Sequence, residues 1–170
     1  MKIKAYVTNL GLYNEGILCG EWVTFPIDED EQEELFKRIK IDDEHEEYFI
    51  TDYDCEIELY DLYDEYVSIE KLNELAEELD NLEEYEEETV LALMSNGYTL
   101  EQALDKKDDV IVYWNCSDMT DVAEQYAEET GLLNDIPDNL QSYFDFEAFG
   151  RDMGYEGEYI FYGSNCYEVL

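Results

Sequence analysis

The residues of this chain with the most chemical potential are its carboxylates. The chain has 47 Asp and Glu against 9 Lys and Arg, so its formal net charge at pH 7 is −38 over 170 residues. With so many carboxylates, a pair at almost any distance is expected by chance. The acid and base pair of a glycosidase therefore cannot be recognised from spacing. The only histidine, His45, lies in the acidic run 42–47, and we interpret it as a solvated loop residue rather than a catalytic base.

Metal and cofactor motifs are incomplete or missing in the sequence. Acids alternate over residues 52–58 as the ligands of an EF-hand loop do, but Ile57 stands where the turn glycine belongs and Tyr63 where the bidentate acid belongs. No Gly-rich phosphate loop, HExxH or GxSxG motif occurs. We expect no catalytic activity, no metal and no cofactor. The four cysteines form no CxxC pair and are interpreted as free buried thiols: Cys19, Cys55, Cys116 and Cys166.

A second use of carboxylates is to present a field of negative charge. In residues 69–104 the only basic side chain is Lys71, whereas ordinary helix surfaces intersperse Lys and Arg among the acids. Five carboxylates fall within residues 83–88, which span about 9 Å of helix. That run carries roughly one charge per 1.8 Å of axis, close to the one per about 1.7 Å of duplex DNA.

The charge is spread almost evenly along the chain, so it does not belong to an acidic tail. Residues 1–60 have a net charge of −12, and residues 61–108 and 109–170 each have −13. At the density of duplex DNA, 38 charges correspond to about 65 Å, or about 19 base pairs. Charge alone leaves four alternatives: a DNA mimic, a halophilic surface, an acidic chaperone for basic proteins, and an unrelated acidic enzyme.

The elements that position these carboxylates can be predicted from hydrophobic periodicity and capping residues. Strands are expected at residues 3–7, 21–25, 48–53, 110–114 and 158–162. A loop is expected at residues 9–20. Helices are expected at residues 28–39, 69–82, 83–96, 99–104, about 118–130, a short stretch opened by Pro137, and 145–153.

These elements predict an α+β fold made of three small modules with an acid-coated surface. The modules are an N-terminal α+β module at residues 1–60, a helical module at 61–108 and a C-terminal α+β module at 109–170. A compact globule of this length has a radius of gyration of roughly 15 Å. Because 38 like charges repel strongly on so small a body, we expect an elongated chain. No apolar run suits a signal peptide or a membrane span, so a cytoplasmic location without membrane contact is expected.

Several stretches resemble ArdA-type antirestriction proteins, in order and over both ends of the chain. The matching N-terminal stretches are residues 9–11, 13–16, 20–22 and 46–53. The matching C-terminal stretches are residues 121–123, 128–131, Pro137 and 143–152. Residues 54–108 match in acidity and helical character only.

This resemblance implies a protein of mobile genetic elements that blocks type I restriction-modification enzymes by imitating bent B-form DNA. It also implies a homodimer formed through the C-terminal module, which at the same charge density imitates about 38 base pairs. The implied partner is the DNA-binding groove of the enzyme's methyltransferase core, with no direct binding of nucleic acid. The runner-up function is an acidic chaperone or binding module for basic nucleic-acid-binding proteins.

The carboxylates expected to imitate phosphates lie on the three acidic helical stretches. They are Glu70, Glu74, Glu77, Glu78, Glu83, Glu84, Glu86, Glu87, Glu88, Asp121, Glu124, Glu128 and Glu129. Arg151 is the only basic residue of the last 62 residues, 109–170. We expect it to form a structural salt bridge with Asp145, Glu147 or Asp152.

Overall fold

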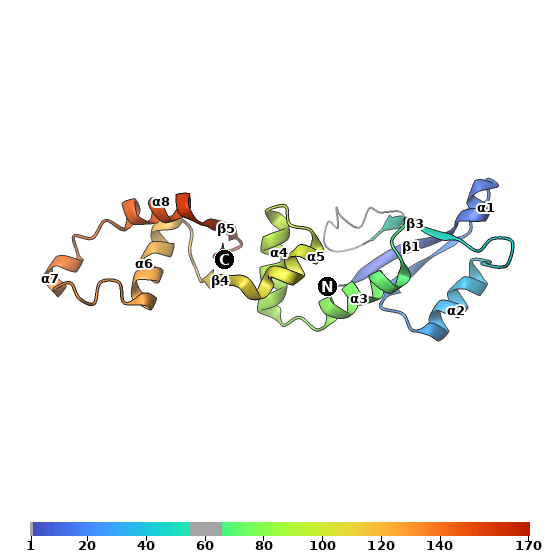
Figure 1. Cartoon of the computed structure of the whole chain (residues 1–170), viewed down its shortest axis with the longest axis horizontal. Helices are drawn as coiled ribbons and strands as arrows, with labels where there is room; N and C mark the ends of the chain where they lie inside the picture. The colour runs from blue at the N-terminus through green and yellow to red at the C-terminus, as the bar shows by residue number, and fades with distance from the viewer. Residues whose placement is uncertain (1, 55–65) are drawn as a thin grey trace. The chain divides into compact units, whose positions relative to one another are not determined.

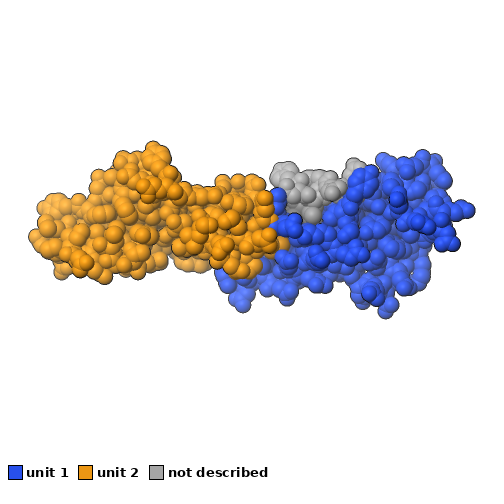
Figure 2. Space-filling view, in the orientation of Figure 1, with its two compact units in different colours: residues 1–87, 99–101 blue, residues 88–98, 102–170 orange. Residues whose placement is uncertain are grey.

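The computed structural model describes residues 2–54 and 66–170 (Figure 1). The described chain is a mixture of helix and sheet, which confirms the α+β prediction. Its contacts divide it into two compact units, residues 1–87 with 99–101 and residues 88–98 with 102–170 (Figure 2). The boundary expected near residues 60 and 61 lies outside the described residues, and the three-module division stays a prediction.

The first unit is built on a three-stranded antiparallel sheet. Its strands are β1 (Ile3–Asn9), β2 (Gly20–Phe25) and β3 (Tyr48–Tyr53), in the order β2-β1-β3. Buried and half-buried residues alternate in β1 from Ile3 to Val7, as the period of two of a strand with one covered face requires, and Thr8 and Asn9 at its end are both buried. The sheet contributes these core side chains: Ile3, Ala5, Val7, Val23, Phe25 and Ile50.

The helices of the first unit begin at side-chain caps that satisfy free backbone N–H groups. Helix α2 (Glu29–Arg38) begins at Asp28, which forms a reciprocal capping box with Glu31. Helix α3 (Ile69–Asp80) begins at Ser68, whose hydroxyl accepts from the N–H of Lys71. The apolar stripe of α3 is buried: Ile69, Leu72, Leu75, Ala76 and Leu79.

One short helix lies where the sequence predicts a loop. Helix α1 (Leu10–Asn14) occupies part of residues 9–20. It forms because the side chain of Asn9 accepts from the N–H of Leu12 at 2.9 Å, which caps the first turn. The glycines in this stretch are typical of turns, and a helix of only five residues is too short to show a helical pattern in the sequence.

Two helices contribute residues to both units. They are α4 (Glu84–Ser95) and α5 (Leu100–Lys106), which is followed by the 3-10 turn η1 (Lys107–Asp109). Both helices agree with the predicted helical stretches at 83–96 and 99–104 within about two residues. Their apolar faces are buried: Val90, Ala92, Leu93, Leu100, Ala103 and Leu104.

The second unit contains another three-stranded antiparallel sheet. Its strands are β4 (Val110–Tyr113), β5 (Glu158–Tyr162) and β6 (Asn165–Val169), in the order β4-β6-β5. The sequence prediction lacks β6, which is the central strand. Its residues 165–167 are buried in succession. The strand therefore shows no alternation of apolar and polar residues from which it could be recognised in the sequence.

The helices of the second unit are α6 (Met119–Thr130), α7 (Asp138–Gln141) and α8 (Phe146–Glu156). Asp118 caps α6, and Gly131 ends it in the left-handed conformation at φ 67°. Helices α6 and α8 pack closely at Gly150, because a Cβ there would collide with the carbonyl oxygen of Met119. Beside these helices lies a core of Tyr113, Cys116, Val122 and Cys166.

Candidate functional site

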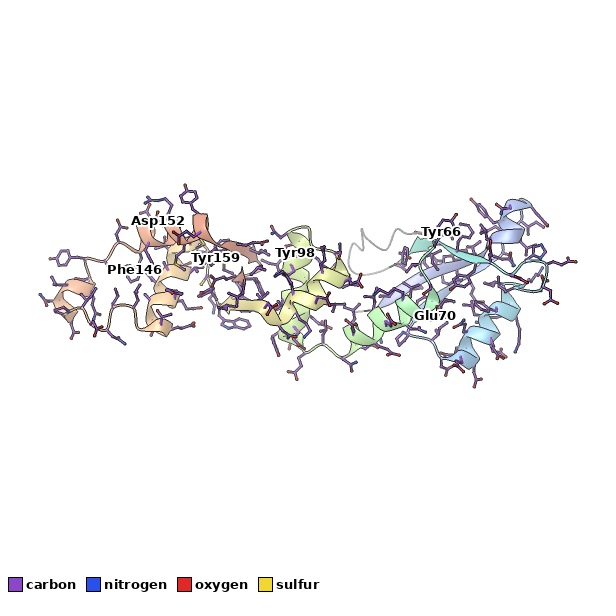
Figure 3. All side chains as sticks on the ribbon, in the orientation of Figure 1. Tyr66, Glu70, Tyr98, Phe146, Asp152 and Tyr159 are labelled. Atoms are coloured by element: carbon purple, nitrogen blue, oxygen red, sulfur yellow. The ribbon has the colours of Figure 1, made fainter. Side chains whose placement is uncertain are left out.

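The most extensive polar feature of the described chain is its exposed carboxylates. None of the Asp and Glu in residues 2–54 and 66–170 is buried. On α3 the apolar stripe faces the core, and the carboxylates of the remaining face are exposed, as Glu70 illustrates (Figure 3). Burying a carboxylate without a partner is costly, so the helix leaves its acids in solvent. The exposed acids of α3 are Glu70, Glu74, Glu77, Glu78 and Asp80.

The acidic run at the start of α4 divides into exposed and half-buried members. Glu83, Glu84 and Glu88 are exposed, whereas Glu86 and Glu87 are half-buried. The side chain of Glu86 reaches back to accept from the N–H of Glu83 at 2.9 Å, so it stabilises the first turn of the helix. The negative charges in this turn also lie where the helix dipole favours them.

On α6 the predicted carboxylates have two different environments. Glu124, Glu128 and Glu129 are exposed. Asp121 is half-buried and accepts from both the N–H and the hydroxyl of Ser117, each at 2.7 Å. These hydrogen bonds hold the pKa of Asp121 below its ordinary value. Asp121 therefore stays ionised while it fixes the loop before the helix.

The basic residues compensate only a small part of this charge. Arg38 lies 2.7 Å from Glu21, and Lys71 lies 2.7 Å from Glu101 and 3.9 Å from Glu74. These side chains are partly exposed, and such pairs contribute little to stability. The chain has only nine Lys and Arg against 47 carboxylates, so most of the negative charge has no basic partner.

Arg151 makes an ion pair with one of its three expected partners. Its Nη2 lies 3.4 Å from Oδ1 of Asp152, and both side chains are exposed. Asp145 instead caps α8, where it accepts from the N–H of Ala148. Glu147 is exposed in the first turn of the same helix.

One carboxylate that the sequence prediction missed forms hydrogen bonds inside the second unit. Glu168 on β6 accepts from the hydroxyl of Tyr113 at 2.8 Å and from that of Tyr159 at 2.7 Å. Burial and these hydrogen bonds raise the pKa of both tyrosines. Burial also raises the pKa of the neighbouring Cys166 to about 12, so this thiol stays protonated. Only an assignment of β6 from the sequence would have placed Glu168 between the two rings.

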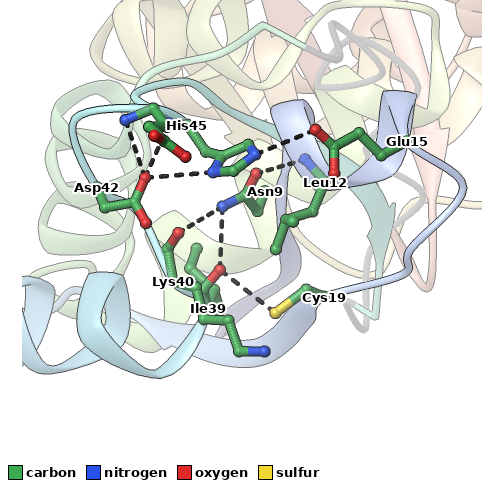
Figure 4. A network of polar contacts seen from close by, with 9 residues as sticks. Asn9, Leu12, Glu15, Cys19, Ile39, Lys40, Asp42 and His45 are labelled. Atoms are coloured by element: carbon green, nitrogen blue, oxygen red, sulfur yellow. Dashed lines mark hydrogen bonds and ion pairs between the residues drawn. The ribbon is translucent and has the colours of Figure 1, made fainter.

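The environment of His45 differs from the sequence prediction. Its side chain is only 18% exposed and lies between carboxylate oxygens of Asp42 and Glu15 (Figure 4). The prediction that His45 is a solvated loop residue is therefore wrong. The ring packs against Gly11 of α1, a contact between segments that spacing along the chain does not predict.

The hollows of the described surface resemble this acidic surface in composition. One between β2 and α2 has a volume of about 420 Å³, and four of its ten lining residues are acids.

No group of three or more His, Cys, Asp or Glu suited to a metal ion occurs among the residues that the structure describes. No helix in the described ranges is long and apolar enough to cross a membrane. The three described cysteines are free; Cys116 and Cys166 are buried as predicted, whereas Cys19 is only half-buried. Cys55 lies outside the described residues.

Some residues that carry the sequence resemblance have specific backbone roles. Asn9 is fully buried, and its side-chain amide donates to the carbonyls of Ile39 and Lys40. A Cβ at Gly20 would lie 2.7 Å from the carbonyl oxygen of Val7, so only glycine fits there without a shift. These positions set the fold rather than the charge.

A comparison with curated proteins finds no match for the chain. The family model described as "Antirestriction protein (ArdA)" matches residues 5–168, which is nearly all of the 170-residue sequence. The chain therefore belongs to the ArdA family of antirestriction proteins.

Proposed function

We propose that this chain inhibits type I restriction-modification enzymes by occupying the DNA-binding groove of the methyltransferase core. The observation that carries the proposal is the set of exposed carboxylates on α3, α4 and α6, for which the chain has too few basic partners. Membership of an antirestriction family supplies the class of target. The carboxylates take the place of the phosphates of bent B-form duplex.

The physical basis is electrostatic and needs no chemical step. A groove that binds duplex DNA is lined with Lys and Arg, and neutralising such charges releases bound counterions. A dense set of carboxylates attracts the same groove and steers the approach of the two proteins. Phosphate contacts position a protein on DNA, and base contacts specify the sequence. A mimic of phosphates is thus expected to inhibit enzymes with different target sequences.

The predicted carboxylates differ in exposure, and this difference supports a division of their roles. We propose that the exposed ones make the contacts, and that the half-buried Glu86 and Asp121 act mainly by holding the helix starts. The exposed set is Glu70, Glu74, Glu77, Glu78, Glu83, Glu84, Glu88, Glu124, Glu128 and Glu129. Like charges repel, so direct binding of nucleic acid is not expected.

The three-module division, which the element pattern predicts, and the homodimer, which the family resemblance implies, are both part of the proposal. In this proposal, two copies associate through residues 109–170 and present a continuous acidic surface. Because the action is binding, the chain needs no cofactor and is not an enzyme.

A binding titration separates this function from the acidic-chaperone alternative. The purified chain is titrated into several type I methyltransferase cores with different target sequences, and separately into a histone-like basic protein. We expect tight binding to every methyltransferase and weak binding to the histone-like protein, with both reduced by salt. Selective binding to the histone-like protein, with restriction unaffected, would favour the chaperone and contradict the proposal.

A further inference from the structure

His45, the only histidine of the chain, lies between two carboxylates. Its Nδ1 lies 3.2 Å from Oδ1 of Asp42, and its Nε2 lies 3.4 Å from Oε1 of Glu15 (Figure 4). A Cβ at Gly11 would lie 2.6 Å from Cδ2 of the ring, so the ring sits directly against α1. The position of the ring is therefore fixed by packing as well as by its two polar contacts.

A count of donors and acceptors shows which form of the ring fits. Ionised carboxylates only accept hydrogen bonds, and a neutral imidazole has one N–H donor and one acceptor nitrogen. A neutral ring thus leaves one lone pair facing a carboxylate. The imidazolium form has two donors, one for each carboxylate. The hydrogen bond to Glu15, followed by that to Asp42, raises the pKa of His45 above its ordinary value of 6.5, although burial acts against the charge.

The two carboxylates belong to separate segments of the first unit. Glu15 is the residue that ends α1. Asp42 and His45 belong to the turn between α2 and β3, where Oδ1 of Asp42 also accepts from the N–H of Glu44 and of His45, both at 3.0 Å. The protonated ring therefore joins the end of α1 to this turn.

A second connection between the same segments does not depend on a proton. The side chain of Asn9 donates to the carbonyls of Ile39 and Lys40 and accepts from the N–H of Leu12. An amide does not titrate, so this connection holds the start of α1 at any pH. Towards its end, α1 is held by the ring of Tyr13, whose centroid lies 5.1 Å from that of Phe49 on β3, and by the contact of Glu15 with His45.

We infer that His45 is a proton-dependent lock that fixes the end of α1 to the turn between α2 and β3. When the ring loses its proton, one of its nitrogens presents a lone pair to a carboxylate, so Glu15 and Asp42 no longer both have a donor and the contact that joins the end of α1 to the turn is weakened. The charged groups that face the ring are Asp42 from its own turn and Glu15 from α1. The other charged side chains of the turn are exposed: Lys40, Asp43 and Glu44. The lock is independent of the proposed function.

The direction of the pH dependence follows from the raised pKa of His45. Stabilisation of the end of α1 is complete below the ordinary value of 6.5 and disappears as the pH rises through the value in the folded protein. Ile17 and Leu18 are exposed on the loop that follows this segment, and we expect their mobility to increase on the alkaline side.

The test combines histidine titration with amide hydrogen exchange by NMR on the whole chain. We expect His45 to titrate above 6.5, and the N–H groups of Glu15 and Ile17 to lose protection as it does. After correction for the intrinsic exchange rate, linkage sets the loss at about tenfold for each pH unit by which the pKa exceeds the ordinary value. Amides of α6 should show no such change.

Two matched variants separate the lock from a general charge effect. Glu15→Gln removes a carboxylate that faces the ring, and Glu44→Gln removes an exposed carboxylate of the same turn. Glu15→Gln should lower the pKa of His45 and reduce the change in α1 protection, whereas Glu44→Gln should change both less. The inference is overturned if His45 titrates at or below 6.5, if the two variants behave alike, or if α1 protection ignores the titration.

Discussion

At the residue scale, the carboxylates of this chain perform two kinds of work. Most project into solvent and add to a collective field, as on α3. A few are held by donors of the protein itself, such as Asp121 by Ser117 and Glu168 by two tyrosines. Changes in the first group should alter binding, and changes around the second group should alter stability.

We predict that single exposed carboxylates contribute little and that clusters contribute much. One Glu→Gln change within 83–88 should weaken inhibition less than about fivefold, the upper end for an exposed ion pair. Neutralising all five glutamates of this run should weaken it by one to two orders of magnitude, if each contributes about 0.5 kcal/mol. The measurement is inhibition of a type I methyltransferase at constant salt.

A charge-conserving control separates the loss of negative charge from any disturbance of the helix in that experiment. Replacing the same five glutamates by aspartate keeps every charge and should retain most of the inhibition. A single exposed Glu→Gln change that abolished inhibition without unfolding the chain would contradict the collective field.

We predict that Tyr113→Phe destabilises the second unit although it removes one atom. Tyr113 is 2% exposed, and its loss of the hydroxyl leaves Glu168 with one donor instead of two. The free energy of unfolding should fall by about 1–3 kcal/mol, the cost of losing a hydrogen bond to a charged group. Denaturant unfolding measures this, with Tyr143→Phe as control because Tyr143 is 83% exposed. Equal effects of both changes would argue against the Glu168 network.

At the element scale, close packing of α6 on α8 depends on one glycine. We predict that Gly150→Ala lowers the free energy of unfolding by about 1–3 kcal/mol or more, since its Cβ meets the backbone of Met119. Gly154→Ala is the matched control in the same helix, because its Cβ would lie in ordinary contact with the Met119 side chain at 3.4 Å. It should be neutral or stabilise by about 0.5–1 kcal/mol. The helix contact would be misplaced if Gly154→Ala proved the more damaging change.

The elements differ in how well the sequence predicts them. Helices α3 and α6 were predictable because an apolar stripe and a terminal cap agree, as with Asp118 and Gly131 on α6. Helix α1 could not be predicted, because it depends on a single asparagine cap. Strand β6 could not be predicted either, because it lies in the centre of its sheet. The exposed carboxylates could be predicted from helix periodicity. The contacts of His45 and Glu168 could not, since they join segments distant in the sequence.

At the scale of the whole molecule, the net charge has opposite effects on folding and binding. Repulsion among 38 uncompensated charges destabilises the folded chain, and salt screens it over a Debye length of about 10 Å at 0.1 M and about 3 Å at 1 M. We predict that sodium chloride raises the melting temperature while it weakens inhibition. The variant with five glutamates neutralised should gain less from salt. A melting temperature that fell with salt would show that favourable ion pairs outweigh the repulsion.

In the proposed function, the chain and duplex DNA compete for the same groove. The most direct measurement is the equilibrium affinity of a type I methyltransferase core for its duplex target, determined at increasing concentrations of the chain. We predict that the apparent affinity for DNA falls in proportion to the bound chain, with no complex containing enzyme, chain and DNA together. An unchanged affinity for DNA at saturating chain would contradict the claim.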